Sequence, residues 1–214
     1  MLENLGVPME IDKKKGKLYV ISGPSGAGKG TITTRILEET DMGYSVSMTT
    51  RAPRTGEIDG VHYFFSTKEQ FKKMIDDGGF LEHAERYGNY YGTPKAPALE
   101  KLAKGQDVIL EIEMQGAMQV KKNYPDGVFI FILPPSLPIL RQRLIDRKTE
   151  TPEAVELRLS STLDEMRYMD DYDYYVVNNE LDEAVERVKS IIIAEHSKIT
   201  MTADEIIRKY KEEA

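Results

Sequence analysis

Nine consecutive residues, GPSGAGKGT at positions 23–31, constrain the fold of this chain more than any other segment. They follow an apolar run that is typical of a buried strand (KLYVIS), and residues 32–39 after them have helical periodicity. The glycines let the backbone wrap closely around an anion and direct its N–H groups inward, and the positive end of the next helix adds to the attraction. The segment therefore predicts a phosphate-binding loop between a strand and a helix, with Lys29 as a point charge for a transferred phosphoryl group.

Short apolar runs alternate with helical stretches in the rest of the chain. Because the runs are apolar on both faces, they suit strands that helices cover on either side, and we expect an α/β core with a parallel sheet flanked by helices. Strands are predicted at residues 18–21, 108–112, 128–133 and 174–177. Helices are predicted after Gly30, after Ser66 with Glu69 three residues on, from Pro94 to Gly105, after Ser136, from Pro152 to Tyr168 and from Leu181 to His196.

Two segments interrupt this alternation. Residues 45–93 contain short alternating aromatic runs and turn signals, which predict a small inserted region with a mixed or antiparallel sheet. Residues 141–168 carry several arginines around a TETPE break between two helices, which we interpret as a mobile helical lid. The expected division is an N-terminal extension at 1–16, a core at 17–44, 94–140 and 169–197 with the insertion and the lid between its parts, and a C-terminal helix at 198–214.

Composition and charge exclude several classes of protein. The 214 residues include no cysteine, which excludes a disulfide framework, a cysteine nucleophile and a thiolate metal site, and the three histidines show no ligand spacing. A formal charge of −7 argues against non-specific binding to nucleic acid. Acidic residues interrupt the apolar positions near the N-terminus, so that no signal-peptide core forms. We therefore expect a cytoplasmic protein with neither a nucleic acid nor a membrane as its partner.

Arginines in the inserted region predict a second anion site. Arg51 and Arg54 lie three residues apart around a proline, in a stretch that cannot form a regular helix. Two guanidinium groups on a short rigid loop can bind a phosphate through paired hydrogen bonds, and the hydroxyl of Tyr63 can join them. On this segment alone, a solvated surface pair of arginines is the alternative interpretation.

Six segments in a fixed order carry a resemblance to a known family: GPSGAGKGT, SVSMTTRAPRTGEIDGVHYFF, FLEHAERYGNYYGTP, ILEIEMQGA, LPPS and RKTET. Together they resemble guanylate kinase, over about residues 17–197. The resemblance implies a P-loop kinase core with a GMP-binding insertion and a lid. It also implies reversible phosphoryl transfer from MgATP to GMP or dGMP, giving ADP and GDP or dGDP, as part of purine nucleotide metabolism.

The same resemblance implies which positions carry the site. The ATP-binding set would be Gly23, Pro24, Ser25, Gly26, Ala27, Gly28, Lys29, Gly30, Thr31, Arg143 and Arg147. The GMP-binding set would be Ser47, Arg51, Arg54, Tyr63, Glu82, Tyr91, Thr93 and Glu113. The catalytic set would be Lys29, Arg51, Arg143, Arg147 and Arg158.

The chemistry of guanine fits the positions that the resemblance assigns to the base. Guanine presents an O6 acceptor beside the N1 and N2 donors, so Glu82 can accept from both donors while a hydroxyl at Thr93 or Ser47 donates to O6. Adenine offers the opposite pattern, and the carboxylate would then stay unpaired at a high cost. We therefore expect the site to reject AMP.

Three positions depart from the family pattern. Gly30 stands where a hydroxyl is expected directly after the lysine, and the hydroxyl comes one residue later at Thr31. Glu113 stands where aspartate is usual, and Lys148 where glycine is usual. We expect Mg²⁺ to be held with the nucleotide phosphates, with water linking it to Thr31, Glu111 or Glu113.

Other functions share parts of these motifs. A monophosphate kinase for another base would share the phosphate loop, and a catalytically silent domain of the same family would serve as a protein-binding module. A regulatory GTPase would need an NKxD element, and none of the five asparagines is followed by lysine. A panel of nucleotides separates these alternatives.

Overall fold

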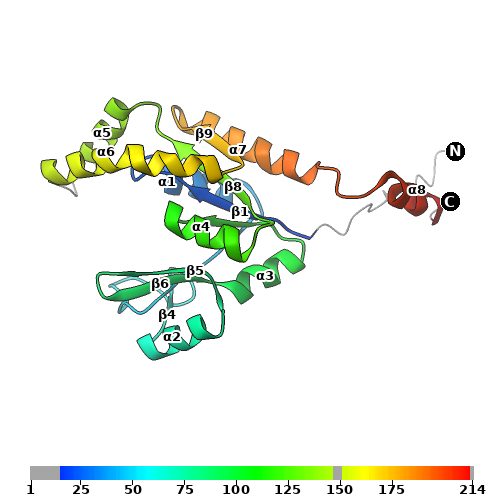
Figure 1. Cartoon of the computed structure of the whole chain (residues 1–214), viewed down its shortest axis with the longest axis horizontal. Coiled ribbons are helices and arrows are strands. Elements are labelled where there is room, and N and C mark those ends of the chain that lie inside the picture. Colours follow the sequence, from blue (N-terminus) through cyan, green and yellow to red (C-terminus); the bar gives the residue numbers. More distant parts are fainter. Residues whose placement is uncertain (1–14, 147–150, 213–214) are drawn as a thin grey trace.

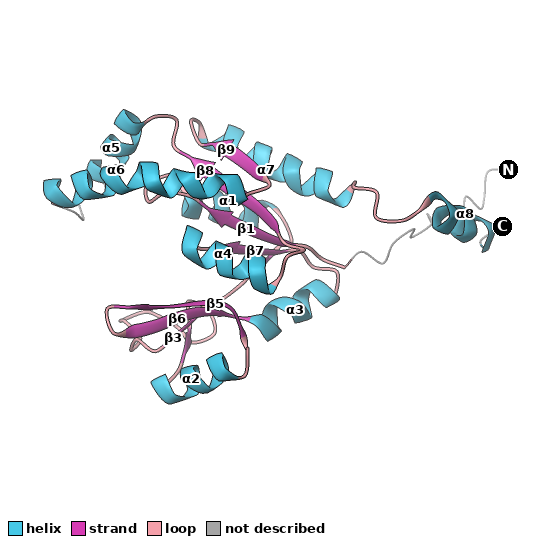
Figure 2. Cartoon of the chain, in the orientation of Figure 1, coloured by secondary structure: helices cyan, strands magenta, loops and turns pink. Residues whose placement is uncertain are grey.

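The computed structural model describes residues 15–146 and 151–212, and these form two sheets with helices around them (Figure 1, Figure 2). The strands are β1 (Leu18–Ser22), β2 (Gly43–Tyr44), β3 (Met48–Thr49), β4 (Phe64–Phe65), β5 (Phe80–Arg86), β6 (Asn89–Pro94), β7 (Val108–Glu111), β8 (Val128–Leu133) and β9 (Tyr174–Val177). The helices are α1 (Lys29–Glu39), α2 (Lys68–Asp76), α3 (Lys95–Ala103), α4 (Met114–Asn123), α5 (Leu137–Asp146), α6 (Pro152–Met166), α7 (Leu181–His196) and α8 (Ala203–Glu212), with a 3₁₀ turn at Arg167–Asp171.

The first sheet is parallel and has the strand order β2-β7-β1-β8-β9. Its central strand β1 is buried throughout, and its side chains alternate between two apolar clusters. Tyr19 and Ile21 belong to the cluster that includes residues of α1 and α7, whereas Leu18 and Val20 belong to the one that includes residues of α3 and α4. Because both faces are covered in this way, the strands are apolar on both sides. The predicted α/β core with a parallel sheet flanked by helices is confirmed.

The second sheet is mixed, with the order β4-β3-β6-β5. β3 pairs in parallel with β4, and β6 pairs antiparallel with both β3 and β5. Helix α2 covers it, because Phe71 stacks on Phe80 and Tyr90 with ring centres 4.4 and 5.5 Å away. Leu81 of β5 points the other way and is buried in the cluster under α4. Figure 1 shows α4 between the two sheets, so that β5 ties the second sheet to the core.

Several expectations about local structure need correction. Helix α1 begins at Lys29, so Gly30 lies inside the helix and only the three preceding glycines of the loop have positive φ. Helix α2 is capped by Thr67 with Gln70, one residue later than predicted. Helix α4 and strand β2 were not predicted, and a 3₁₀ turn replaces the end of the helix expected up to Tyr168.

The C-terminal helix α8 is shorter than the predicted segment, and Figure 1 shows it apart from the two sheets. Across the described part of the chain, no helix combines the length and the apolar character needed to cross a membrane.

Candidate functional site

The phosphate loop leaves β1 and enters α1 directly. Gly26 and Gly28 have φ angles of 87° and 93°, in the left-handed region that favours glycine. A Cβ at Gly28 would also lie 2.2 Å from the Nδ2 atom of Asn178, so a side chain has no room there. Gly28 is the N-cap of α1 and no side chain caps the helix, so the positive end of the helix dipole lies at the loop.

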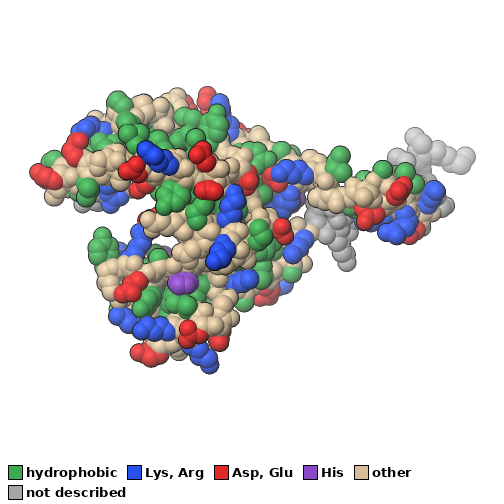
Figure 3. All heavy atoms as spheres, viewed as in Figure 1, with side chains coloured by type: hydrophobic (Ala, Val, Ile, Leu, Met, Phe, Trp, Pro, Cys, Tyr) green, Lys and Arg blue, Asp and Glu red, His purple; other side chains and the backbone are tan. Residues whose placement is uncertain are grey.

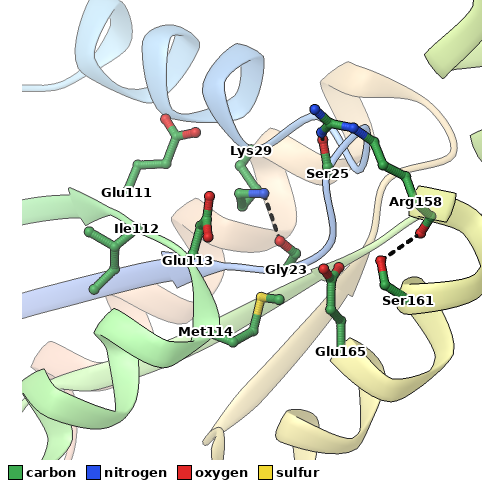
Figure 4. A pocket seen from close by; sticks show the side chains of 10 residues that line it. All are labelled: Gly23, Ser25, Lys29, Glu111, Ile112, Glu113, Met114, Arg158, Ser161 and Glu165. Atoms are coloured by element: carbon green, nitrogen blue, oxygen red, sulfur yellow. Dashed lines mark hydrogen bonds between the residues drawn. The ribbon is translucent and has the colours of Figure 1, made fainter. Parts of the chain in front are cut away.

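Lys29 lies at the edge of a cleft of about 330 Å³ beside this loop (Figure 4). Its Nζ atom donates to the carbonyl oxygens of Gly23, at 2.6 Å, and Pro24, at 3.0 Å. Arg158 of α6 donates from Nη1 to Oγ of Ser25 at 2.5 Å, which brings a second cation to the loop. The cleft is lined by Gly23, Ser25, Lys29, Glu111, Ile112, Glu113, Met114, Arg158, Ser161 and Glu165.

Three carboxylates in this cleft differ in their ionisation. Burial raises the pKa of Glu111, although Lys29 opposes the shift. Burial also raises the pKa of Glu165. Hydrogen bonds from Arg86 lower the pKa of Glu113, which favours its charged form. The positive charges of Lys29 and Arg158 thus lie near two carboxylates that burial makes easier to protonate and one that Arg86 makes harder to protonate.

A second cleft of about 470 Å³ adjoins the first one and shares Glu111, Ile112 and Glu113 with it. Figure 3 shows the molecule hollowed on this side, between helices α5 and α6 and the β5–β6 hairpin. Five of the residues predicted for the GMP site line this cleft beside Glu113: Ser47, Arg54, Tyr63, Glu82 and Tyr91. The rings of Tyr63 and Tyr91 meet edge to face, with centres 6.3 Å apart.

Arg51 is held at the side of this cleft by Glu57. Its Nη1 and Nη2 atoms each donate to one carboxylate oxygen of Glu57 at 2.9 Å, and the backbone N–H of Arg54 donates to the same carboxylate at 2.7 Å. These bonds lower the pKa of Glu57 to about 2. Glu57 therefore fixes the loop that carries both arginines, a role that the sequence did not suggest.

Glu82 is buried, with 8% of its surface exposed, and accepts a hydrogen bond from Oγ1 of Thr93 at 2.6 Å. An irregularity in the β5–β6 pairing lies between Phe80 and Glu82, a type of feature that redirects side chains near functional sites. Burial raises the pKa of Glu82. Because a hydroxyl donates only one proton, Thr93 is committed to orienting Glu82 here, and Ser47 is a second hydroxyl that lines the same cleft.

A third cavity of about 480 Å³ lies on the other side of the phosphate loop. Gly26, Gly28, Thr31 and Arg143 line it with Asp146, Asn178, Asn179 and Leu181. Arg143 donates from Nη2 to the carbonyl oxygen of Asn178 at 3.0 Å. Pro24 and Ala27 are buried in the loop and Gly30 lies in α1, while Arg147 and Lys148 fall outside the described residues.

The clefts also contain residues that the sequence analysis did not single out. Arg86, Gln115, Gly116 and Gln119 line the second cleft, and Glu165 lines the first. Glu165 follows Arg158 by seven residues, two helical turns, so its position on the same face could have been inferred. Arg86 and Gly116 carry no such signal, because their places depend on how β5 packs against α4.

No group of three or more histidine or acidic side chains placed to hold a metal ion occurs in residues 15–146 and 151–212. Glu111 and Glu113 nevertheless lie at the junction of the first two clefts, and carboxylate oxygens are ligands that suit Mg²⁺. An ion that takes most of its ligands from phosphates and water fits this arrangement.

Comparisons with known proteins agree on one family. A sequence model described as guanylate kinase matches residues 15–195. The guanylate kinase of Clostridioides difficile is 53% identical over 201 residues, which cover 94% of this chain and 98% of that protein. That of Oceanobacillus iheyensis is 52% identical over 200 residues, covering 93% and 95%. The crystal structure of guanylate kinase from Anaplasma phagocytophilum has a TM-score of 0.69 at 34% identity and covers 88% of this chain and 90% of that chain.

Proposed function

The chain belongs to the guanylate kinase family, and we propose that it transfers the γ-phosphoryl group of ATP reversibly to GMP or dGMP, giving ADP and GDP or dGDP. It is thus a nucleoside monophosphate kinase of purine metabolism. The observation that carries this proposal is the meeting of two clefts at Glu111, Ile112 and Glu113. One cleft contains the phosphate loop, and the other contains arginine, tyrosines and a buried carboxylate.

The acceptor phosphate is already an anion at neutral pH, so the reaction needs no general base. Catalysis then consists of aligning two anions, neutralising their repulsion and excluding water. Lys29 and Arg158 line the first cleft and neutralise the transferred group, while Arg54 and the hydroxyls of Tyr63 and Tyr91 bind the acceptor phosphate. Arg51 reaches that phosphate when it leaves Glu57.

The base of GMP is recognised by the buried pair of Glu82 and Thr93. In its charged form Glu82 accepts from N1 and N2 of guanine, and Thr93 holds it in place. Ser47 donates to O6 from the wall of the same cleft. AMP presents an acceptor at N1 and would leave Glu82 without the two donors that guanine supplies, which lowers the affinity for AMP strongly.

The donor nucleotide binds on the phosphate loop, with its base toward the cavity of Arg143 and Asn178. With ATP bound, Mg²⁺ would be held by the nucleotide phosphates and, through water, by Glu111 or Glu113 of the first cleft, whereas Thr31 lines the cavity on the other side of the loop. Such an ion supplies charge neutralisation on the donor phosphates. We place the reaction in the cytoplasm, with ATP and GMP as the partners.

The proposal is tested by ADP formation from MgATP with GMP, AMP, UMP, CMP or no acceptor at equal enzyme concentrations. Turnover is expected with GMP only. Turnover with another monophosphate instead would assign a different base, and GMP binding by calorimetry without turnover would indicate a protein-binding module.

Lys29→Met is the matched test of the phosphate loop. We expect kcat to fall by about three orders of magnitude, the scale found when one donor to transition-state charge is removed, with unchanged far-UV circular dichroism. Lys68→Met, on the exposed side of α2, is the control and keeps full activity. Retained activity of Lys29→Met would remove this lysine from the mechanism.

A further inference from the structure

Gly116 lies in the first turn of α4 and faces the carboxylate of Glu82. A Cβ atom at this position would lie 3.1 Å from Oε2 of Glu82 and 3.5 Å from its Cδ and Cγ atoms. The first distance is shorter than ordinary van der Waals contact, so the carboxylate would have to move by a few tenths of an ångström. The present position of the Glu82 carboxylate therefore depends on the absence of a side chain at position 116.

Glu82 has little freedom to move away. Thr93 holds its Oε1 atom at 2.6 Å, and the backbone of Glu82 pairs with Thr93 in the β5–β6 ladder. On the backbone side, β6 passes so close that even a Cβ added at Gly92 would lie only 2.8 Å from the carbonyl oxygen of Glu82. A side chain at position 116 would thus turn the Glu82 carboxylate and change the direction in which it accepts hydrogen bonds, because strand β5 cannot shift to make room.

The backbone gives no other reason for glycine at this position. Gly116 is not among the glycines with positive φ, and it lies within a regular α-helix. Glycine is disfavoured in a helix relative to alanine, because it loses more conformational freedom on folding. Space for Glu82 is therefore what distinguishes glycine from alanine here.

We propose that Gly116 is a specificity-determining position for the acceptor, which keeps the Glu82 carboxylate aligned with the two adjacent N–H donors of a 2-amino-6-oxopurine. This inference rests on the proposed function, because it assigns Glu82 to the base of GMP. Gly116 acts through Glu82 and is a positioning residue. Its effect falls on the choice of base and on the KM for the acceptor, whereas binding of ATP at the other cleft does not depend on it.

Gly116→Ala tests the inference, with kcat/KM measured for GMP and for IMP, which lacks the 2-amino group. We expect the KM for GMP to rise on the order of tenfold, because a displacement of a fraction of an ångström misaligns the carboxylate with the base. The KM for ATP should stay within twofold. The preference for GMP over IMP should shrink by a similar factor. Lys122→Ala, on the exposed side of the same helix, is the control and changes none of these values.

An active Gly116→Ala enzyme with the parental KM for GMP and the parental GMP-to-IMP ratio would overturn the inference. Failure of the proposed function is distinct, because the unmodified enzyme would then show no GMP-dependent turnover. If Gly116→Ala lowers the Tm, the double variant Glu82→Ala/Gly116→Ala shows whether contact with Glu82 is the cause. A Tm that recovers to that of Glu82→Ala supports the contact, and one that stays low shows that α4 itself does not accept alanine.

Discussion

Arg86, at the end of β5, donates from both Nη1 and Nη2 to the two carboxylate oxygens of Glu113, the N-cap residue of α4. The ion pair joins β5 of the second sheet to the start of helix α4. Arg86 also contributes positive charge near Glu82, in a cleft that contains three carboxylates. The ion pair therefore limits the negative charge that an incoming anion meets.

Replacing Arg86 should weaken acceptor binding more than stability. Arg86→Gln leaves Glu113 unneutralised beside the acceptor phosphate, so we expect the KM for GMP to rise about threefold, as for the loss of a partly exposed ion pair. In a double-mutant cycle on the KM for GMP, adding Arg86→Gln to the Glu113→Gln variant should cause no further rise in KM. Lys104→Gln, which breaks an exposed pair with Glu100 far from the clefts, is the control. If Arg86→Gln raised the KM for GMP equally in the parent enzyme and in Glu113→Gln, the two residues would not be coupled.

Thr93→Val keeps the shape of the side chain and removes its hydroxyl. Glu82 then loses its donor while it stays buried, and we expect a loss of about 1.5–3 kcal/mol in GMP binding, the range for hydrogen bonds to charged groups. Calorimetric titration of GMP measures it. Thr33→Val is the matched control, because Thr33 is also buried and its hydroxyl has no hydrogen-bond partner within the described residues. Unchanged GMP affinity in Thr93→Val would rule out the orienting role.

Acceptor binding should weaken as the pH falls toward 5. Burial raises the pKa of Glu82, so the carboxylate takes up a proton at a higher pH than an exposed glutamate and then no longer accepts from both guanine donors. The KM for GMP measured between pH 5 and 8 should therefore rise at the acidic end. Glu82→Gln should have a high KM at every pH and should retain only the titration of GMP itself, so an unaltered profile in this variant would contradict the assignment.

The same pKa shift has a consequence for stability. Because the folded-state pKa of Glu82 is raised, the folded state binds the proton more tightly, and the charged carboxylate costs stability at pH values above its unfolded pKa. Glu82→Gln should therefore not lower the Tm at pH 7. If the variant has a higher Tm than the parent, the difference should shrink as the pH falls. A Tm that drops at pH 7 would show that the carboxylate is stabilising.

Leu81→Ala should destabilise the whole protein. Leu81 is fully buried in the cluster that contains Val20 and Phe129, and such truncations cost about 2–5 kcal/mol through lost burial and the cavity left behind. Urea unfolding measures the change. Leu157→Ala is the control, because this side chain of α6 is exposed, and its expected change is within about 0.5 kcal/mol. A small effect of Leu81→Ala would mean that the second sheet is only loosely attached.

Four strands of the parallel sheet could be predicted because runs of apolar and aromatic residues mark them in the sequence. The predicted strands at residues 128–133 and 174–177 have the observed bounds, and the helix from Leu181 to His196 likewise. Helix α4 escaped prediction because no side chain caps it and a glycine occupies its first turn. The contacts of Glu57 and the Arg86–Glu113 pair could not be predicted for another reason. The residues they join come close only through a turn of the chain or through packing between elements.

The segment from Glu111 to Glu113 belongs to the walls of both nucleotide clefts. Any adjustment of these three residues on binding one substrate changes the surface that the other substrate meets. Binding of ATP and GMP is then linked, and thermodynamic reciprocity requires that the factor by which ATP alters the dissociation constant of GMP equals the factor by which GMP alters that of ATP. One short connection between a strand and a helix thus gives the two binding equilibria a single shared coupling factor.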